Sequence, residues 1–174
     1  MSNHNYSEIP IIIKPNFYKD ERGYFIETWN KSNNIWPNND WVQDNESCSS
    51  RGVMRGFHWQ MPPYEQAKLV RVIKGSVIDY AVDIRKNSPT YGKIWSVELT
   101  EENKYQFYIP RGFAHAFISL EDNTIFSYKC DNYYSKDHEN SFNIDYIVEK
   151  NTVILSDKDN KAKHFNELTD NDIL

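Results

Sequence analysis

The feature that most constrains the fold of this chain is a two-residue alternation of side chains through its middle. Between residues 68 and 85, for example, Ile78 and Tyr80 fall on one face of an extended strand, whereas Asp79 and Ala81 fall on the other. Successive side chains of a β-strand point to opposite faces, so this period predicts strands and argues against helix. The central part of the chain is therefore expected to be all-β.

Segments of the same character follow at short intervals and are separated by turn signals. Lys74-Gly75 is interpreted as the turn of a β-hairpin. Further strands are expected at residues 93–99, 105–110, 115–120 and 124–130. Many short strands spaced in this way are typical of an antiparallel sandwich, barrel or jelly roll. Only the tail has a helical pattern, because Ser156 followed by Asp159 resembles a capping box.

Size, charge and cysteine content narrow the class of protein. The 174 residues are expected to form a single domain, 1–174, with a sizeable core. A formal net charge of -5 argues against nucleic-acid binding, which usually leaves a basic footprint. No apolar run approaches the roughly 20 residues of a membrane helix, and no secretory signal is expected. Cys48 and Cys130 are too few for a disulfide framework, so reduced thiols and a cytoplasmic location are expected.

Cationic and titratable side chains stand among apolar residues in VMRGFHWQ (53–60) and shortly after it. His58 is either a core histidine with one hydrogen bond or a general base, since histidine titrates near neutral pH. Lys68 either extends its ammonium group to the surface or faces a developing oxyanion in a dry cavity. Strict alternation puts Arg55 and His58 on opposite faces, so an irregularity is expected at Gly56 if both residues serve one site.

Two later residues can likewise be interpreted either as structural or as functional. His115 follows a Pro-x-Gly turn, as in the second motif of metal-binding cupins. Those proteins carry an earlier His-x-His, where this chain has His58-Trp59-Gln60, so no catalytic metal is expected. Tyr128 is either a packed core tyrosine or a general acid.

Several other polar residues have ordinary explanations when they are taken alone. Arg22 and Glu27 flank a turn glycine and could be a solvated charge pair. The stretch at residues 43–45 is interpreted as a polar turn. Asp159 could simply cap the C-terminal helix.

In their order along the chain, however, these stretches closely resemble the dTDP-4-dehydrorhamnose 3,5-epimerase family, a metal-free branch of the cupin jelly rolls. The matching stretches span nearly the whole chain and are DERGYFIE, VQDN, VMRGFHWQ, QAKLVRVIKGSVIDYAVDIRKNSPTYGK, ENKYQFYIPRGFAHAF, YKCDNYYS and LSDKD. The resemblance implies an antiparallel jelly-roll (cupin) barrel with its site inside, an N-terminal sheet extension and a short C-terminal helical segment. Arg111 and Ala116 depart from the family's usual IPEGFAHG, so a different cavity mouth is expected.

The resemblance also implies a role for each matching residue. His58 matches the catalytic base, and Asp159 matches the carboxylate that pairs with it. Tyr128 matches the acid on the opposite face of the sugar, and Lys68 matches the lysine near the substrate's C4 oxygen. Tyr134 matches an aromatic that stacks on the nucleotide base. The positions that contact the nucleotide sugar or its diphosphate are matched by Arg22, Glu27, Gln43, Asn45, Arg55, His115, Glu139 and Lys158.

The function that this resemblance implies is a cofactor-free epimerase acting on a nucleotide-diphosphate 4-keto sugar. Inversion at C3 and C5 of dTDP-4-dehydro-6-deoxyglucose, on the route to rhamnose, O-antigen or capsule, is the simplest expectation. Inversion at C3 alone, or a GDP-linked 4-keto heptose as substrate, is the alternative. A non-catalytic sugar-nucleotide binding module and a metal-dependent cupin oxygenase are alternatives of other classes. Relatives exchange N-terminal strands, so a homodimer is expected in which Arg22 serves the neighbouring subunit.

Overall fold

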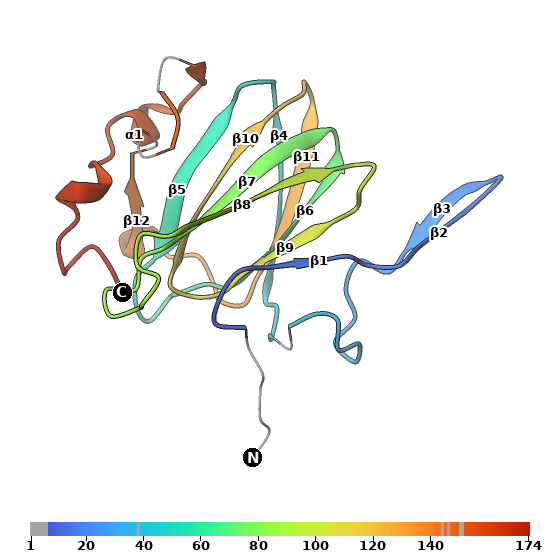
Figure 1. Cartoon of the computed structure of the whole chain (residues 1–174), viewed down its shortest axis with the longest axis horizontal. Coiled ribbons are helices and arrows are strands. Elements are labelled where there is room, and N and C mark those ends of the chain that lie inside the picture. The colour runs from blue at the N-terminus through green and yellow to red at the C-terminus, as the bar shows by residue number, and fades with distance from the viewer. Residues whose placement is uncertain (1–6, 38, 144, 146, 150–151) are drawn as a thin grey trace.

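The alternating segments form two five-stranded antiparallel sheets that face each other (Figure 1). The computed structural model describes residues 7–37, 39–143, 145, 147–149 and 152–174. The first sheet has the order β1 (Ile11–Ile13), β9 (Gln106–Ile109), β6 (Lys68–Lys74), β11 (Thr124–Cys130) and β4 (Gln43–Ser49). The second has the order β12 (Glu139–Phe142), β5 (Met54–Gln60), β10 (Phe113–Ser119), β7 (Ser76–Asp83) and β8 (Ile94–Thr100). The expected jelly-roll barrel is confirmed.

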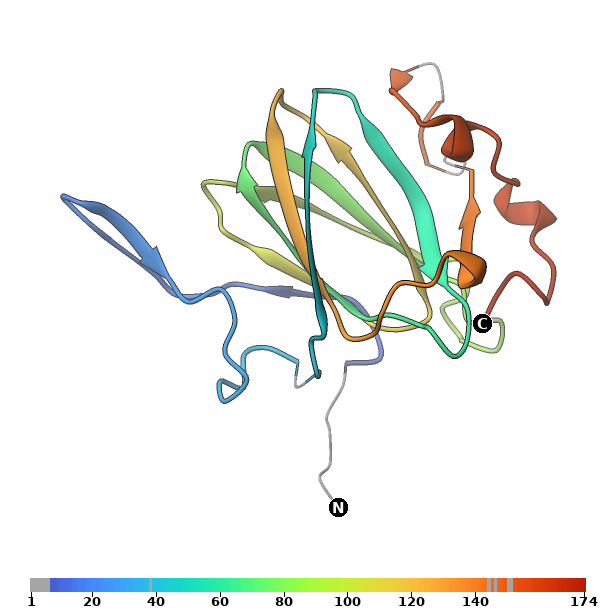
Figure 2. The same cartoon turned by 180° about the vertical axis from the view of Figure 1, so that it is seen from behind.

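The N-terminal extension is also present. Strands β2 (Phe17–Asp20) and β3 (Gly23–Ile26) pair only with each other and project away from the barrel as a hairpin (Figures 1 and 2). The hairpin exposes Tyr18, Tyr24 and Phe25. Among the described residues, no helix is long and apolar enough to cross a membrane.

Two local expectations about the strands are wrong. Lys74-Gly75 is not the turn of a hairpin, because β6 pairs with β9 and β11 whereas β7 pairs with β8 and β10. At this point the chain crosses from one sheet to the other. The chain does turn at Gly75, which has φ +79. A turn residue indicates a change of chain direction, but it does not indicate which strands pair. Residues 43–45, expected as a polar turn, begin strand β4.

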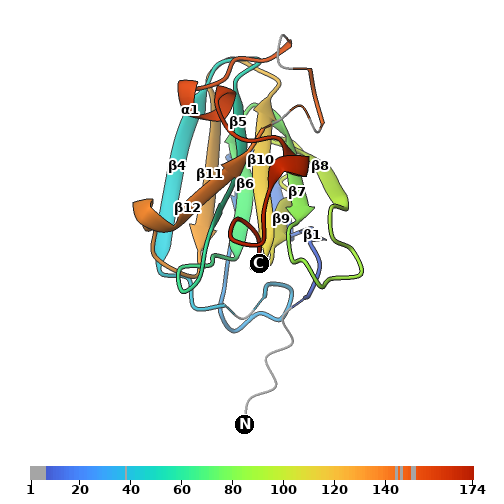
Figure 3. The same ribbon diagram turned by 90° about the vertical axis from the view of Figure 1, so that its left-hand side faces the viewer.

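Apolar side chains are buried on both faces of the second sheet, and its inner face also carries Arg55, His58 and His115. Inside the barrel, Phe117 and Phe126 stack with their ring centroids 4.1 Å apart. On the outer face, Phe57 stacks on Phe142 at 4.5 Å, and Trp59 packs beside them. The C-terminal segment lies across this outer face (Figure 3) and shields the cluster from solvent.

The C-terminal segment is less helical than the sequence suggests. Ser156 does cap a helix by accepting a hydrogen bond from the Asp159 backbone N–H, but α1 covers only Asp157–Asn160. Short 3-10 turns occur at η1 (Lys136–His138) and η4 (Phe165–Glu167). The remaining tail is irregular and is held by tertiary bonds, such as those from Asn140 and Lys163 to Asp172. Tertiary packing has overridden local helix propensity here.

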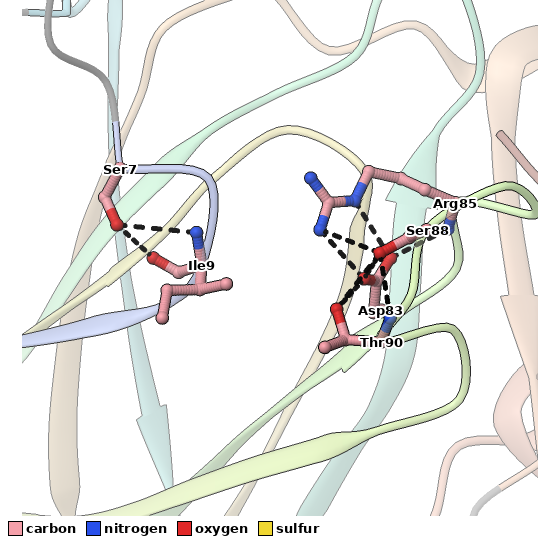
Figure 4. Close-up of polar contacts among 6 residues, drawn as sticks. All are labelled: Ser7, Ile9, Asp83, Arg85, Ser88 and Thr90. Carbon is pink, nitrogen blue, oxygen red and sulfur yellow. Dashed lines mark hydrogen bonds and ion pairs between the residues drawn. The ribbon is translucent and has the colours of Figure 1, made fainter.

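One buried carboxylate organises the turn between β7 and β8 (Figure 4). Asp83 is fully buried and accepts hydrogen bonds from the Arg85 backbone N–H and guanidinium and from the hydroxyls of Ser88 and Thr90. Burial alone would raise the pKa of Asp83, but these donors outweigh it and hold the pKa at about 2. The carboxylate thus remains ionised while it ties the turn to the barrel.

We expect Asp83→Asn to lower the free energy of unfolding by about 2–4 kcal/mol, because the amide cannot accept from both Arg85 nitrogens. The folded-state pKa is depressed, so the stability from ionisation is complete above about pH 4 and is lost as pH falls towards 2. Urea denaturation between pH 2 and 7 measures both effects. Ser88→Ala, which removes a single donor, should cost about 1 kcal/mol. Equal stability of wild type and Asp83→Asn at pH 7 would contradict this role.

Candidate active site

The register of β5 against β10 breaks where the sequence predicts an irregularity. His58 lies opposite His115, whereas Arg55 lies opposite Phe117, so three residues of β5 span the same distance as two of β10. This bulge rotates the side chains between the two positions. As a result Arg55 and His58 line the same cavity, and the expectation attached to Gly56 is confirmed.

The cavity that holds these residues has a volume of about 470 Å³ and opens between the sheets. A smaller adjoining space of about 100 Å³ shares four of its lining residues. Of the residues singled out from the sequence, the larger cavity is lined by Asn45, Arg55, His58, Lys68, His115, Tyr128 and Asp159. The smaller one adds Gln43, Tyr134 and Glu139.

A histidine–carboxylate pair lies at the wall of this cavity. The Nε2 atom of His58 is 2.6 Å from Oδ1 of Asp159, across 101 residues of sequence. The other oxygen, Oδ2, accepts from the hydroxyl of Ser156 at 2.8 Å. Burial alone would raise the pKa of Asp159, but the hydrogen bonds from His58 and Ser156 outweigh it and lower that pKa. The side chain of Asp159 thus contacts His58, whereas the helix is capped by the side chain of Ser156, which accepts from the Asp159 backbone N–H.

Gly56 is needed for this pair in a second way. Its backbone N–H lies 3.5 Å from Oδ2 of Asp159. A Cβ atom at this position would lie 3.2 Å from both Cγ and Oδ1 of Asp159, which is tighter than ordinary packing allows. The absence of a side chain thus permits the carboxylate to approach β5 closely.

Lys68 and Tyr128 occupy the opposite wall, on neighbouring strands β6 and β11. The ammonium nitrogen of Lys68 lies 5.9 Å from the centroid of the Tyr128 ring. Burial lowers the pKa of Lys68 and raises that of Tyr128, because it disfavours the charged form of each group. Tyr128 therefore keeps its proton and can donate it, and Lys68 does not simply extend to the surface.

Asp79, the partner of His115 in a further buried pair, was not singled out from the sequence. Asp79 on β7 is fully buried, and its two carboxylate oxygens lie 3.0 and 2.9 Å from Nε2 of His115. Asp79 also attracts Lys68 electrostatically. The available signal was the position of Asp79 on the same strand face as Val77 and Ala81, where an acidic residue must be buried and requires a partner.

A cluster at the edge of the smaller space links three of the expected residues. Oε2 of Glu139 accepts a hydrogen bond from the Tyr134 hydroxyl at 2.9 Å and forms an ion pair with Nζ of Lys158. The other oxygen of Glu139, Oε1, is 3.7 Å from Nδ1 of His58. Gln43 accepts from the Tyr134 backbone N–H at 3.0 Å, which ties this loop to β4. All these residues therefore belong to one region around His58.

Four residues lie elsewhere. Arg22 is exposed on the hairpin and forms an ion pair with Asp20, whereas Glu27 accepts from asparagines of the following loop. Neither lines the two adjoining cavities around His58 in its own chain. The expectation that Arg111 and Ala116 alter the cavity mouth is wrong. Arg111 forms an ion pair with Asp131 outside the cavity, and Ala116 points into the outer apolar cluster.

This arrangement suits proton transfer within a shielded polar cavity. It combines a histidine whose orientation is fixed by a carboxylate, a tyrosine that retains its proton, and a buried cation. No three histidine, cysteine or acidic side chains of the described residues are grouped as metal ligands. Fold and site together define the class as a jelly-roll protein with an acid–base site inside its barrel.

Comparisons with known proteins identify the family. The sequence profile of dTDP-4-dehydrorhamnose 3,5-epimerase matches residues 8–167. The enzyme of that name from Shigella flexneri is 46% identical over 171 residues, covering 91% of this chain and 93% of its own. The dTDP-6-deoxy-D-glucose-3,5-epimerase of Legionella pneumophila, solved in complex with dTDP-4-keto-L-rhamnose, is 41% identical with a TM-score of 0.86, covering 96% and 94% of the two chains. A 3'-monoepimerase of Streptomyces bikiniensis, in complex with dTDP-quinovose, is 29% identical with a TM-score of 0.80, covering 89% and 83%.

This chain belongs to the dTDP-4-dehydrorhamnose 3,5-epimerase family. It is therefore an isomerase of the epimerase type. The alternatives of a non-catalytic binding module and of a metal-dependent oxygenase are not supported.

We expect Gly56→Ala to lengthen the hydrogen bond between His58 and Asp159, because the new methyl group displaces the carboxylate by a few tenths of an ångström. A short imidazole–carboxylate bond gives a low-field N–H resonance in proton NMR spectra. This resonance should move upfield or broaden in the variant. The ring of His115, bonded to Asp79, serves as an internal control and should keep its own resonance. An unchanged His58 resonance would show that the close approach at Gly56 does not matter.

Proposed function

We propose that this chain is one epimerase domain that inverts C3 and C5 of dTDP-4-dehydro-6-deoxy-D-glucose and yields dTDP-4-dehydro-L-rhamnose for deoxysugar biosynthesis. The proposal depends on one observation: the His58–Asp159 pair lies in the same cavity as Lys68 and Tyr128, on the opposite wall. Relatives named for this reaction at 46% identity, and one bound to dTDP-4-keto-L-rhamnose, support the substrate class.

In this mechanism His58 removes a proton from the carbon beside the ketone. The 4-keto group makes the hydrogens on C3 and C5 acidic, because the electron pair of the broken C–H bond moves to O4 as an enolate. The carboxylate of Asp159 accepts from Nε2 of His58, which leaves Nδ1 as the basic nitrogen. The same carboxylate stabilises the imidazolium that forms.

The opposite wall completes the inversion. Lys68 stabilises the enolate oxygen, since a cation in a desolvated site interacts strongly with developing negative charge. Tyr128 then donates its phenolic proton to the carbon from the other face, and the enolate pair returns to form the new C–H bond. The ketone supplies the activation, so the chemistry itself requires no redox cofactor.

The remaining cavity residues bind the nucleotide part in this proposal. Arg55 would hold the diphosphate, because its planar guanidinium suits phosphate oxygens and its Nε atom is already oriented by Ser49. Tyr134 is half-exposed and would stack on the base. Gln43, Asn45, His115, Glu139 and Lys158 would provide the other polar contacts. Cys48 and Cys130 are both free, in keeping with the proposed cytoplasmic location.

Inversion at C3 alone is a second candidate function. It is favoured by the similarity to the Streptomyces bikiniensis 3'-monoepimerase, whose TM-score of 0.80 covers 89% of this chain. The higher identity to the two-centre enzymes favours the first candidate. The number of carbons that exchange hydrogen with solvent distinguishes the two.

We expect wild-type enzyme in D₂O to introduce deuterium at C3 and C5 of dTDP-4-dehydro-6-deoxy-D-glucose, as followed by proton NMR. His58→Ala should lower this exchange by roughly 10²–10⁴-fold, because the base is removed. Tyr128→Phe should impair completion of the inversion while some exchange remains. His164→Ala, which alters an exposed histidine outside the cavities, is the matched control.

Each outcome decides part of the proposal. Absence of uptake by the wild type with dTDP- and GDP-linked 4-keto sugars would refute the function itself. Uptake at C3 only would establish the monoepimerase. A fully active Tyr128→Phe variant would remove that residue from the role of acid.

We further propose that the active form is a homodimer in which the hairpin of each subunit reaches the cavity of the other. The hairpin projects from its own barrel and exposes Tyr18 and Phe25, which a partner would bury. Its Arg22 and the nearby Glu27 lie outside the two adjoining cavities around His58 in their own chain, although their positions match substrate contacts. A partner subunit would bring both residues to a site.

Mixing two inactive homodimers tests this arrangement. Arg22→Ala lacks the donated residue and His58→Ala lacks the base, so neither homodimer should be fully active. After mixing and subunit exchange, a heterodimer combines one intact hairpin with one intact His58, and activity should reach about a quarter of wild type. Size-exclusion chromatography with light scattering gives the mass. A monomeric mass, or no recovery despite proven exchange, would contradict the shared site.

A further inference from the structure

Inversion by one base and one acid leaves both groups in the wrong protonation state for a second inversion. After one inversion His58 carries the proton taken from carbon, and Tyr128 has lost its own. Before the next inversion the imidazolium must release a proton and the phenolate must gain one. An epimerase that inverts two centres in one encounter must therefore exchange protons with solvent while the substrate still occupies the cavity.

The neighbours of His58 suggest a route for the outgoing proton. Nε2 is occupied by Asp159 at 2.6 Å, so the proton taken from carbon resides on Nδ1. Oε1 of Glu139 lies 3.7 Å from that nitrogen, which is within reach after a small side-chain rotation or through one water molecule. Glu139 enters from β12, where it pairs with Gln60, and faces Nδ1 of the ring, whereas Asp159 faces Nε2.

Glu139 also connects the cavity with solvent, which Asp159 does not. The side chain of Glu139 is only 15% exposed, but its Oε2 contacts the hydroxyl of Tyr134 and the ammonium group of Lys158. Both of these partners are about half-exposed, at 51%. The Asp159 side chain is 6% exposed, and its second oxygen is taken by Ser156 and Gly56. Of the two carboxylates next to His58, Glu139 is the one that reaches the surface.

The electrostatic environment keeps Glu139 ready to accept a proton. Burial alone would raise its pKa, but the contacts with Lys158, His58 and Tyr134 outweigh it and lower that pKa. The group is therefore ionised at neutral pH and returns quickly to the carboxylate after each transfer. Resetting the base requires a group that takes up the proton from His58 and releases it at once, and does not remain protonated.

We propose that Glu139 takes the proton from Nδ1 of His58 after each inversion and releases it to water, so that it resets the base. This inference rests on the proposed function. The N–H bond of the imidazolium breaks and its electron pair stays on Nδ1, while Oε1 of Glu139 forms an O–H bond. Water then removes that proton, and water also returns one to the phenolate of Tyr128. In this step Glu139 acts through His58, in addition to the polar contact proposed for it with the nucleotide sugar.

Glu139→Gln, measured in D₂O by quenched-flow sampling and NMR, tests the relay. The amide keeps the size and much of the hydrogen bonding of the side chain but cannot take up the proton. The second exchange in each encounter should slow by at least about tenfold relative to the first, so singly exchanged sugar accumulates. Small buffer bases such as imidazole should restore the second exchange in proportion to their concentration. A purely structural loss would not respond to them.

Asp137→Asn is the matched control, because it makes the same carboxylate-to-amide change two residues before Glu139 but outside both cavities. Its ratio of second to first exchange should equal that of wild type. An equal slowing of both exchanges by Glu139→Gln, or a raised KM alone, would overturn the relay and leave Glu139 as a binding contact.

The result also remains interpretable if the wild type inverts one centre only. The reset then occurs once per turnover, so Glu139→Gln should show a rapid first turnover followed by a slow, buffer-dependent steady state. Absence of that burst would overturn the inference. Absence of all exchange in the wild type would instead refute the proposed function, so the two failures are distinguishable.

Discussion

The close approach of Asp159 to the bulged part of β5 is the contact on which the site depends. The bulge brings Arg55 and His58 to the same cavity, and the missing side chain of Gly56 lets the carboxylate bond with the His58 ring at 2.6 Å. One backbone irregularity therefore positions both the Arg55 guanidinium and the His58–Asp159 pair in the cavity. It also fixes the C-terminal segment, because Ser156 and the short helix α1 are held against the barrel through the same carboxylate. Bulges next to active sites commonly redirect side chains in this way.

The site also depends on the pairing of opposite charges inside the barrel. Burial disfavours every isolated charge, so each buried ionisable group needs a partner that is itself positioned by a strand. His115 has Asp79, and Lys68 is attracted by Asp79 and Glu139. The neighbouring apolar stack of Phe117 and Phe126 limits the volume that remains polar. The acidic net charge of the chain is thus compatible with a cavity that contains Arg55 and Lys68, since the local arrangement of charges and not their total decides the field there.

Alternation predicted the central strands and the irregularity at Gly56, because both are local signals, whereas the set of residues around His58 was implied by the family resemblance. It did not predict which strands pair across Lys74-Gly75, since a turn residue reports chain direction and not partners. The tail contains the expected helix after Ser156, but that helix is only α1, because bonds to Asp172 replace helix formation in the rest of the tail. The role of Asp79 required knowledge that its strand face points inward, towards His115. Each failure concerns long-range contacts, which no local pattern contains.

Packing explains how a barrel can keep a polar interior and remain folded. Much of the apolar burial of the second sheet lies on its outer face, where Phe57, Trp59 and Phe142 pack beneath the C-terminal segment. Each fully buried aromatic side chain contributes roughly 2–3 kcal/mol, so these contacts offset part of the cost of the charged cavity. The C-terminal segment therefore has two physical tasks that cannot be separated: it covers the outer cluster, and it carries Asp159 to His58. Any rearrangement that loosens this segment must weaken both the packing of the outer cluster and the hydrogen bond between Asp159 and His58.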